Sequence, residues 1–275
     1  METVYDVLTA LDKLGALTDL PLERESGINF DEINRSEGTE VALSNLSYYP
    51  KGGTKPILEQ LSLTIPAGQK LCIAGYNGSG KTTLIQVISC LLLRCEGSIT
   101  YNGVPRNNIN LDSLRGNIGD FSSQEDVFKG TFFENIALGY AHLNLSDVVE
   151  VAKKVGLDEY VRQYPEGYEL PLLPGGKNHP RSVVAKIILA RSLISNPKLL
   201  AIEEFFANIE AKYRDQIADL LTAADSPWTL VAVSDDPVLA SRCERIIVME
   251  AGKIVADGSY EAIKRTTHFA KVFKT

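Results

Sequence analysis

The sequence lacks any hydrophobic run long enough to cross a lipid bilayer, which takes about 20 apolar residues. Its longest apolar stretch, Val87 to Leu93, is interrupted by Ser89. The first residues, Met1 to Thr3, also lack the basic and apolar regions of a signal peptide. We therefore expect a soluble, cytosolic domain.

The sequence also lacks a basic excess and paired cysteine motifs. Lys and Arg total 28 against 35 Asp and Glu, a net charge of −7 that argues against a nucleic-acid partner. No Cys-x-x-Cys pair and no histidine at a metal-ligand spacing accompanies the four cysteines, which we interpret as apolar core residues: Cys72, Cys90, Cys95 and Cys243. The composition, 44 % hydrophobic and 23 % charged, excludes a disordered chain and a collagen.

The first 39 residues differ from the rest of the chain. Apolar residues recur there at helical spacing: Val4, Val7, Leu8, Leu11 and Leu14. A mostly polar run follows from Asn29 to Glu40. We interpret residues 1–39 as a helix and linker, or as the end of a longer chain, and residues 40–275 as the main domain.

From Val41 onward, apolar strand patterns alternate with helical ones. We expect strands at 41–46, 57–65, 71–74, 199–202, 229–233 and 245–249, and helices at 82–93, 183–193 and 237–242. An Asn-Gly pair within Tyr101 to Val104 indicates a hairpin. Residues 130–170 have the pattern of an inserted helical segment. Strands alternating with helices predict an α/β fold with a parallel sheet.

A phosphate-binding loop is the strongest motif. Gly75-Tyr-Asn-Gly-Ser-Gly-Lys-Thr-Thr83 fits G-x-x-x-x-G-K-[ST] and lies between an expected strand and an expected helix. Its glycines let backbone N–H groups approach a phosphate, and the helix N-terminus adds partial positive charge. Lys81 is placed to bridge β- and γ-phosphates, and the Thr82 hydroxyl to ligate Mg²⁺. We expect nucleotide contacts from Gly75, Asn77, Gly78, Ser79, Gly80, Lys81, Thr82 and Thr83.

Two carboxylates follow another apolar strand, in Leu199-Leu-Ala-Ile-Glu-Glu204. The carboxyl end of a central strand is where α/β sheets bind ligands. We expect Glu203 to hold the Mg²⁺ shell and Glu204 to position or deprotonate an attacking water.

The order of motifs from Val41 to Gly258 resembles the nucleotide-binding domain of an exporter-type ABC transporter, of the type I secretion or peptide-exporter kind. The resemblance implies a P-loop NTPase with a RecA-like parallel sheet core, an antiparallel β subdomain and an inserted helical subdomain. Tyr49 resembles the aromatic residue that stacks on adenine. Gln124 resembles the Q-loop glutamine, which contacts Mg²⁺, although an ungapped count back from Gly130 places Ser123 there.

The chain departs from this family where catalysis takes place. Counted back from Ala190-Arg191, the LSGGQ signature falls on His179-Pro-Arg-Ser-Val183, with Leu173 to Lys177 as an alternative. Glu203 stands in place of an aspartate, and Asp235 in place of the switch histidine that holds the γ-phosphate. Asp235 would repel that phosphate by on the order of 1 kcal/mol in water. We therefore expect ATP binding to survive better than ATP hydrolysis.

The resemblance also implies partners. Two such domains sandwich two ATP molecules, so a second nucleotide-binding domain is expected, as a homodimer or a heterodimer. A transmembrane domain would precede Met1 or be a separate subunit. It would dock on residues 124–134, whose apolar side chains also suit a core: Val127, Phe128, Phe132 and Phe133. The location implied is the cytoplasmic side of the inner or plasma membrane.

Four functions remain open at this stage. The first is an exporter subunit that binds and slowly hydrolyses Mg·ATP, and the second is a non-hydrolysing regulatory module of the same fold. A soluble ABC-type protein of DNA repair or translation is disfavoured, because the chain has one cassette and no long inserted coiled coil. A small-molecule kinase is disfavoured because no acceptor pocket or lid arginines are evident.

Overall fold

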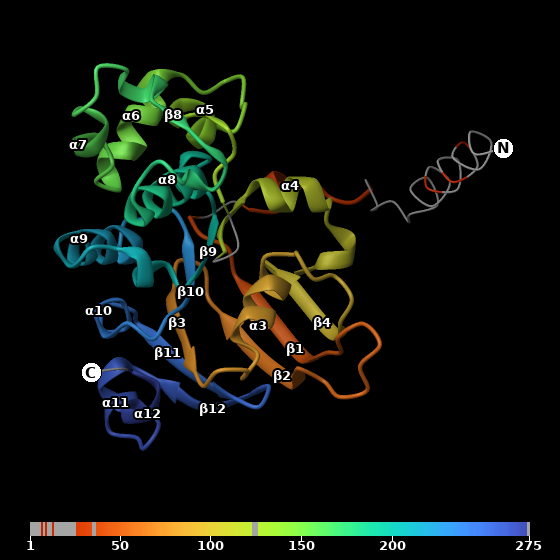
Figure 1. Cartoon of the computed structure of the whole chain (residues 1–275). Coiled ribbons are helices and arrows are strands. Elements are labelled where there is room, and N and C mark those ends of the chain that lie inside the picture. Colours follow the sequence, from red (N-terminus) through yellow and green to blue (C-terminus); the bar gives the residue numbers. More distant parts are fainter. Residues whose placement is uncertain are drawn as a thin grey trace.

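The computed structural model describes Val7, Thr9, Lys13 and residues 26–34, 37–122 and 126–273. Figure 1 shows the chain from red at the N-terminus to blue at the C-terminus. The amphipathic helix expected near the N-terminus lies mostly outside the described residues. Within the described part of the chain, no helix is both long and apolar enough to span a membrane.

A six-stranded sheet forms the centre of the molecule, in the order β12-β11-β3-β10-β9-β6. All neighbouring pairs are parallel except β11 with β12. Its strands are β3 (Lys70–Gly75), β6 (Ile118–Phe121), β9 (Leu199–Glu203), β10 (Thr229–Val233), β11 (Arg245–Glu250) and β12 (Lys253–Gly258). The expected α/β fold with a parallel sheet is confirmed.

A second, antiparallel sheet has the order β2-β1-β4-β5. Its strands are β1 (Val41–Tyr48), β2 (Leu58–Ile65), β4 (Glu96–Tyr101) and β5 (Val104–Pro105). Asn102 and Gly103 both have positive φ, at 49° and 77°, as a two-residue type I′ hairpin requires. The hairpin expected from Asn-Gly and the antiparallel β subdomain are both confirmed.

The helices divide between the sheets and an inserted helical part, which lies at the top of Figure 1. Their bounds are α2 (Phe30–Ile33), α3 (Lys81–Ile88), α4 (Leu111–Gly116), α5 (Phe132–Ala137), α6 (Leu145–Lys154), α7 (Asp158–Val161), α8 (Arg181–Ile194), α9 (Ala211–Thr222), α10 (Pro237–Ala240), α11 (Tyr260–Lys264) and α12 (Phe269–Val272). A short strand pair, β7 (Gly130–Thr131) and β8 (Pro171–Leu172), joins the two ends of the helical part. The predicted helical insertion is therefore present.

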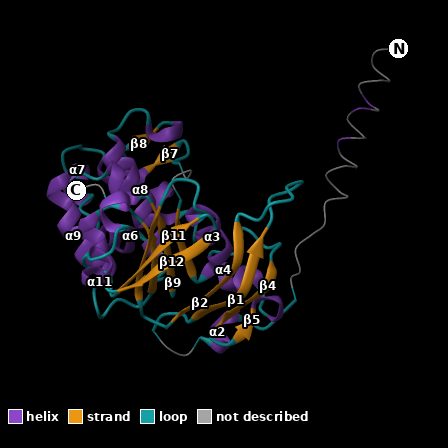
Figure 2. Cartoon of the chain, turned by 90° about the horizontal axis from the view of Figure 1, so that it is seen from below, coloured by secondary structure: helices purple, strands orange, loops and turns teal. Residues whose placement is uncertain are grey.

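The central sheet has a core on each face, because successive side chains of a strand point to opposite sides. Leu71 and Ile73 of β3 join the cluster beneath α3 and the antiparallel sheet. Cys72 and Ala74 join the cluster that packs against α5, α6, α8 and α9. Figure 2 shows the antiparallel sheet and the helical part on opposite sides of the central strands. Burial on both faces explains why the parallel strands are mostly apolar.

Helix α3 ends earlier than the sequence predicts, at Ile88 instead of Leu93. The Tyr101 hydroxyl donates a hydrogen bond to the Ile88 carbonyl at 2.7 Å, and Cys90 takes a left-handed backbone with φ 59°. A side chain from β4 thus donates a hydrogen bond to a carbonyl oxygen of the last helical turn. The apolar run beyond Ile88 is an irregular segment in which Leu91 is exposed.

Residues 26–34 pack onto the domain although they lie before residue 40. The Ile28 N–H donates to the Asn108 carbonyl at 2.8 Å, and the Asn110 N–H donates to the Ile28 carbonyl at 2.9 Å. Phe30 is buried in the cluster beneath α3. The division of the chain after residue 39 stays a prediction.

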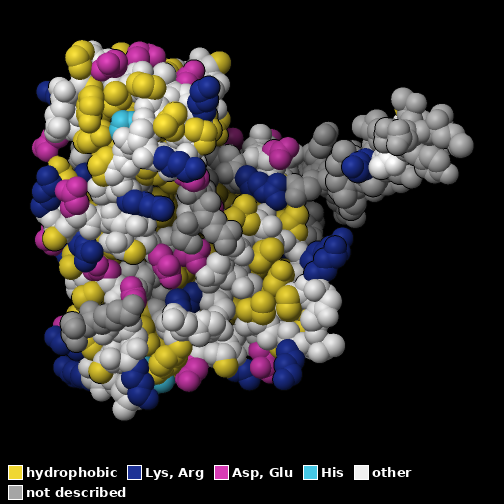
Figure 3. Space-filling view, in the orientation of Figure 1, with side chains coloured by type: hydrophobic (Ala, Val, Ile, Leu, Met, Phe, Trp, Pro, Cys, Tyr) yellow, Lys and Arg dark blue, Asp and Glu magenta, His cyan; other side chains and the backbone are white. Residues whose placement is uncertain are grey.

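Hydrophobic side chains gather on the outer surface of the helical part, where Figure 3 shows them in yellow. The exposed large hydrophobic residues in and beside the helical part are Phe128, Leu138, Tyr140, Leu145 and Leu173. Within the stretch expected to dock a membrane domain, Val127 and Phe132 are buried and Phe128 is 45 % exposed. The core interpretation therefore holds for Val127 and Phe132, and Phe128 is available to a partner.

Candidate nucleotide-binding site

The phosphate loop connects β3 to α3, as its motif predicts. Gly75 has φ 153°, and a Cβ there would lie 2.3 Å from the Met249 carbonyl oxygen of β11. Gly80, the N-cap of α3, has φ 97°, and a Cβ there would lie 3.0 Å from the Ile57 carbonyl oxygen. These two positions require glycine because of close backbone approach and positive φ. The loop is thus wedged between β11 and the start of β2.

The loop presents polar groups that a phosphate would satisfy. No side chain among the described residues caps the N-terminus of α3. The Ser79 hydroxyl is buried and has no hydrogen-bond partner within the described part of the chain. Helix N-termini and unpaired buried donors are where anions bind. The loop therefore fits a phosphate group.

The Lys81 ammonium lies over the loop. Its Nζ donates to the carbonyl oxygens of Gly75 at 2.9 Å and Tyr76 at 3.0 Å. Burial lowers the pKa of Lys81, and the nearby carboxylates of Glu204, Asp235 and Glu203 oppose this shift. The three carboxylates are therefore within electrostatic reach of the ammonium.

Thr82 and Glu203 meet at the carboxyl end of β9. The Thr82 hydroxyl donates a hydrogen bond to Oε1 of Glu203, whose residue is only 4 % exposed. Hard oxygen atoms of this kind suit Mg²⁺, which usually keeps waters and phosphate oxygens as its other ligands. No cluster of three or more His, Cys, Asp or Glu that could hold a metal occurs among the described residues. A metal here would depend on nucleotide phosphates for further ligands.

A cavity of about 230 Å³ opens beside the loop. Its lining residues come from the loop, from the ends of β9 and β10, and from α12: Gly75, Tyr76, Asn77, Lys81, Glu204, Val233, Ser234, Asp235, Lys271 and Val272. Glu204 has a left-handed backbone, with φ 51°, and its N–H donates to the Val233 carbonyl at 3.0 Å. The cavity brings together Lys81 and two of the three predicted catalytic residues, Glu204 and Asp235.

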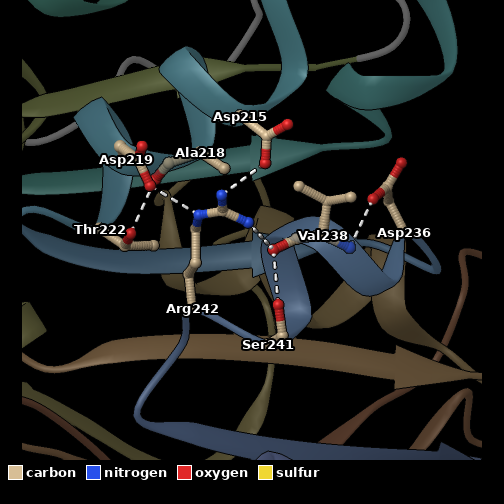
Figure 4. Close-up of polar contacts among 8 residues, drawn as sticks. All are labelled: Asp215, Ala218, Asp219, Thr222, Asp236, Val238, Ser241 and Arg242. Atoms are coloured by element: carbon tan, nitrogen blue, oxygen red, sulfur yellow. Dashed lines mark hydrogen bonds and ion pairs between the residues drawn. The ribbon is translucent and has the colours of Figure 1, made fainter. Parts of the chain in front are cut away.

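Asp235 is held between β10 and a capped helix. Asp236 is the N-cap of α10, accepting from the Val238 N–H at 2.8 Å, and it pairs with Arg214 at 3.0 Å. Arg242 then ties the end of α10 to α9, donating to Asp215 at 2.5 Å and Asp219 at 2.6 Å. Figure 4 shows this arrangement, with Arg242 also reaching the Val238 carbonyl. The short loop that carries Asp235 is therefore fixed at both ends.

The predicted adenine-stacking residue is not part of the cavity lining. Tyr49 is 41 % exposed and follows β1, but it does not line the cavity. Its neighbour Tyr48 accepts from the Ile57 N–H at 2.8 Å, and Ile57 in turn abuts Gly80, so the end of β1 lies near the loop. Gln124 and the alternative Ser123 lie outside the described residues.

The segment aligned with the family signature begins α8. Pro180 is the N-cap and the helix starts at Arg181, which is exposed. The His179 ring lies 2.9 Å from the Tyr160 hydroxyl and 3.0 Å from the Pro171 carbonyl oxygen. The alternative segment, Leu173 to Lys177, contains a 3₁₀ turn in which Gly176 packs against Val184.

Sequence reasoning missed five residues that line the cavity: Tyr76, Val233, Ser234, Lys271 and Val272. Tyr76 and Ser234 adjoin predicted residues, so proximity to the motifs could have found them. Lys271 and Val272 belong to no motif, because their placement depends on how the C-terminal helices fold back.

Comparisons with known proteins match this architecture. The chain matches the ABC transporter family over residues 58–207, more than half of its 275 residues. It is 27 % identical to an ATP-dependent lipid A-core flippase of Legionella pneumophila strain Paris, over 99 % of this chain and 46 % of that protein. It is 29 % identical to the transport/processing ATP-binding protein ComA of Streptococcus pneumoniae strain R6, over 84 % of this chain and 33 % of that protein.

A solved structure has the same fold. The bacterial Atm1-family ABC exporter with ATP bound superposes with a TM-score of 0.83 and 21 % identity, covering 98 % of this chain and 47 % of that one. The chain thus spans less than half the length of each of these three proteins.

Proposed function

Because the chain belongs to the ABC transporter family and carries its ATP-binding domain, we propose that it energises export by binding Mg·ATP and hydrolysing it slowly. The observation that carries the proposal is the cavity beside the phosphate loop, where Lys81, Glu204 and Asp235 meet. Lys81 and the α3 N-terminus bind the phosphates, and Thr82 with Glu203 holds the Mg²⁺ shell. Glu204 positions or deprotonates the attacking water.

Slow turnover follows from the charge of Asp235. Its carboxylate lines the cavity where a terminal phosphate would lie, and two anions a few ångströms apart repel by on the order of 1 kcal/mol in water. The cost is greatest as negative charge builds on the phosphate. The comparisons give no support to the non-hydrolysing alternative, so turnover is proposed to be reduced and not absent.

The proposed partners are a transmembrane domain and a second nucleotide-binding domain. Exposed apolar side chains in and beside the helical part, among them Phe128, Leu138 and Leu173, support docking of another protein. The proposed location is the cytoplasmic side of the inner or plasma membrane. Sedimentation with and without Mg·ATP tests the dimer, which is expected only with nucleotide.

One assay tests the core of the proposal. The purified chain is incubated with Mg·ATP, and bound nucleotide and released ADP are measured in the same sample, with Lys81→Ala as the control. We expect binding that Lys81→Ala abolishes and ADP formation slower than about 1 s⁻¹, the lower range of ordinary enzymes. Binding unaffected by Lys81→Ala would overturn the proposal, and Lys81-dependent binding without any ADP would favour the regulatory alternative.

A further inference from the structure

The cavity beside the phosphate loop contains a second cation that no motif predicts. Lys271 of α12 lines it together with Lys81, Glu204 and Asp235. The C-terminal end of the chain thus contributes to the same cavity as the phosphate loop near the start of the domain. Val272, the next residue, lines the cavity as well.

Helix α12 is held firmly enough to position this lysine. The Phe269 and Phe273 rings lie 5.0 Å apart, and Tyr260 of α11 contacts Phe269 at 5.6 Å between centroids. Phe273 is 1 % exposed, and both phenylalanines belong to the main core cluster. Figure 1 shows α11 and α12 together at the blue end of the chain. With these neighbours buried, the exposed Lys271 is kept at the cavity wall.

A second cation changes the net charge of the cavity lining. Among its described lining residues, the cations are Lys81 and Lys271 and the anions are Glu204 and Asp235. The lining is therefore electrically balanced only when Lys271 is counted. Without it, a nucleotide carrying several negative charges would enter a cavity with a net negative wall.

The position of the cavity indicates which phosphate would benefit. A phosphate loop cradles the α- and β-phosphates with its backbone, and its lysine reaches the β- and γ-phosphates. Glu204 and Asp235 follow the ends of β9 and β10, line this cavity with Lys81 and lie within electrostatic reach of its ammonium. A third phosphate is therefore the part of the nucleotide nearest to these residues.

We propose that Lys271 is a phosphate-binding residue whose ammonium offsets Asp235 and favours a nucleoside triphosphate over a diphosphate. The inference rests on the proposed function, since it takes the phosphate loop to bind ATP. It assigns to helix α12 a second cation in the cavity that Asp235 also lines.

The test compares ATP and ADP affinities, measured by calorimetry with Mg²⁺ present, for the intact chain and three variants. We expect Lys271→Ala to weaken ATP binding about fivefold and ADP binding less than twofold, as for a partly exposed charge contact. Lys271→Arg, which keeps the charge, should stay within about twofold of the unaltered chain. Lys264→Ala removes an exposed lysine of α11 outside the cavity lining and should change neither affinity.

The outcomes separate this inference from the function on which it rests. Two results would overturn the role of Lys271 alone, provided that ATP binding still depends on Lys81. In the first, Lys271→Ala leaves ATP affinity unchanged. In the second, Lys271→Ala weakens ATP and ADP binding equally. Absence of Lys81-dependent ATP binding in the unaltered chain would overturn both.

Discussion

The Thr82 hydroxyl donates a hydrogen bond to the Glu203 carboxylate, joining the first turn of α3 to the last residue of β9. The bond brings together two oxygen atoms, one from a helix and one from a strand, that are proposed to ligate Mg²⁺. Glu203 is longer by one methylene than the aspartate of the family pattern, yet its carboxylate still reaches Thr82. The two side chains proposed to hold Mg²⁺ are therefore already in contact with each other.

We predict that Glu203→Gln weakens the Mg²⁺ dependence of ATP binding about tenfold, the lower range for changes next to a metal. The amide keeps the shape of the side chain and loses the negative charge that favours the cation. ATP affinity is measured in Mg²⁺ and in EDTA for both chains. An unchanged ratio of the two affinities would contradict the assignment, and exposed Glu166→Ala serves as the control.

Removal of the Asp235 charge should strengthen ATP binding. Because Asp235→Asn eliminates a repulsion on the order of 1 kcal/mol, we expect about fivefold tighter binding. Asp235→His should in addition raise the rate of ADP formation, since an imidazole can donate to the phosphate. Nucleotide titration and an ADP assay check both, with exposed Asp112→Asn as the matched control. Weaker ATP binding by Asp235→Asn would show that the carboxylate has another role.

Stability should depend on pH through Asp120 of β6. Burial raises the pKa of Asp120 from 3.8 to about 6, so the folded chain holds this proton to higher pH than the unfolded chain. The contribution of Asp120 to the free energy of unfolding is greatest below pH 4 and falls as the pH rises to about 6. Asp120→Asn should flatten this fall and stabilise the chain at pH 7.5 by about 1–2 kcal/mol. Urea unfolding at several pH values measures the free energy of unfolding of both chains. If that free energy changes with pH as steeply in Asp120→Asn as in the unaltered chain, the prediction is wrong.

Asn135→Ala should destabilise the segment next to the expected docking surface by about 2–3 kcal/mol, because buried polar groups lose their partners. Asn135 is fully buried, accepts from the Phe128 N–H at 3.0 Å, and donates to the carbonyl oxygens of Phe128 at 3.1 Å and Thr131 at 3.0 Å. Arg191 also donates to Asn135 at 3.1 Å. Chemical denaturation provides the measurement, and exposed Asn107→Ala should cost less than about 0.5 kcal/mol. Equal effects of the two changes would contradict the prediction.

Features set by local pattern could be predicted from the sequence. The strand before the phosphate loop, the Asn102-Gly103 hairpin and the placement of Glu203 at a strand end follow from apolar runs and turn residues that act over short distances. The backbone preferences of turn residues and the alternation of apolar side chains depend only on residues close together in the sequence. The phosphate loop can therefore be located from its motif, and Glu203 from the apolar strand that precedes it.

Features that depend on distant contacts could not be predicted. The end of α3 depends on Tyr101 of β4, whose hydroxyl donates to the Ile88 carbonyl. Lys70 can be buried because its ammonium donates to the Trp228 carbonyl at 2.6 Å. Lys271 reaches the cavity only because aromatic residues of α11 and α12 pack together. Local pattern carries no information about such pairs.

The contact between Gly75 and Met249 bears on the thermodynamics of ligand binding. Gly75 pairs with Met249 in the ladder between β3 and β11, and this pairing fixes where the loop backbone begins. A loop whose shape is set by the sheet loses little conformational entropy when a ligand arrives. More of the interaction energy with a bound phosphate would then remain as affinity.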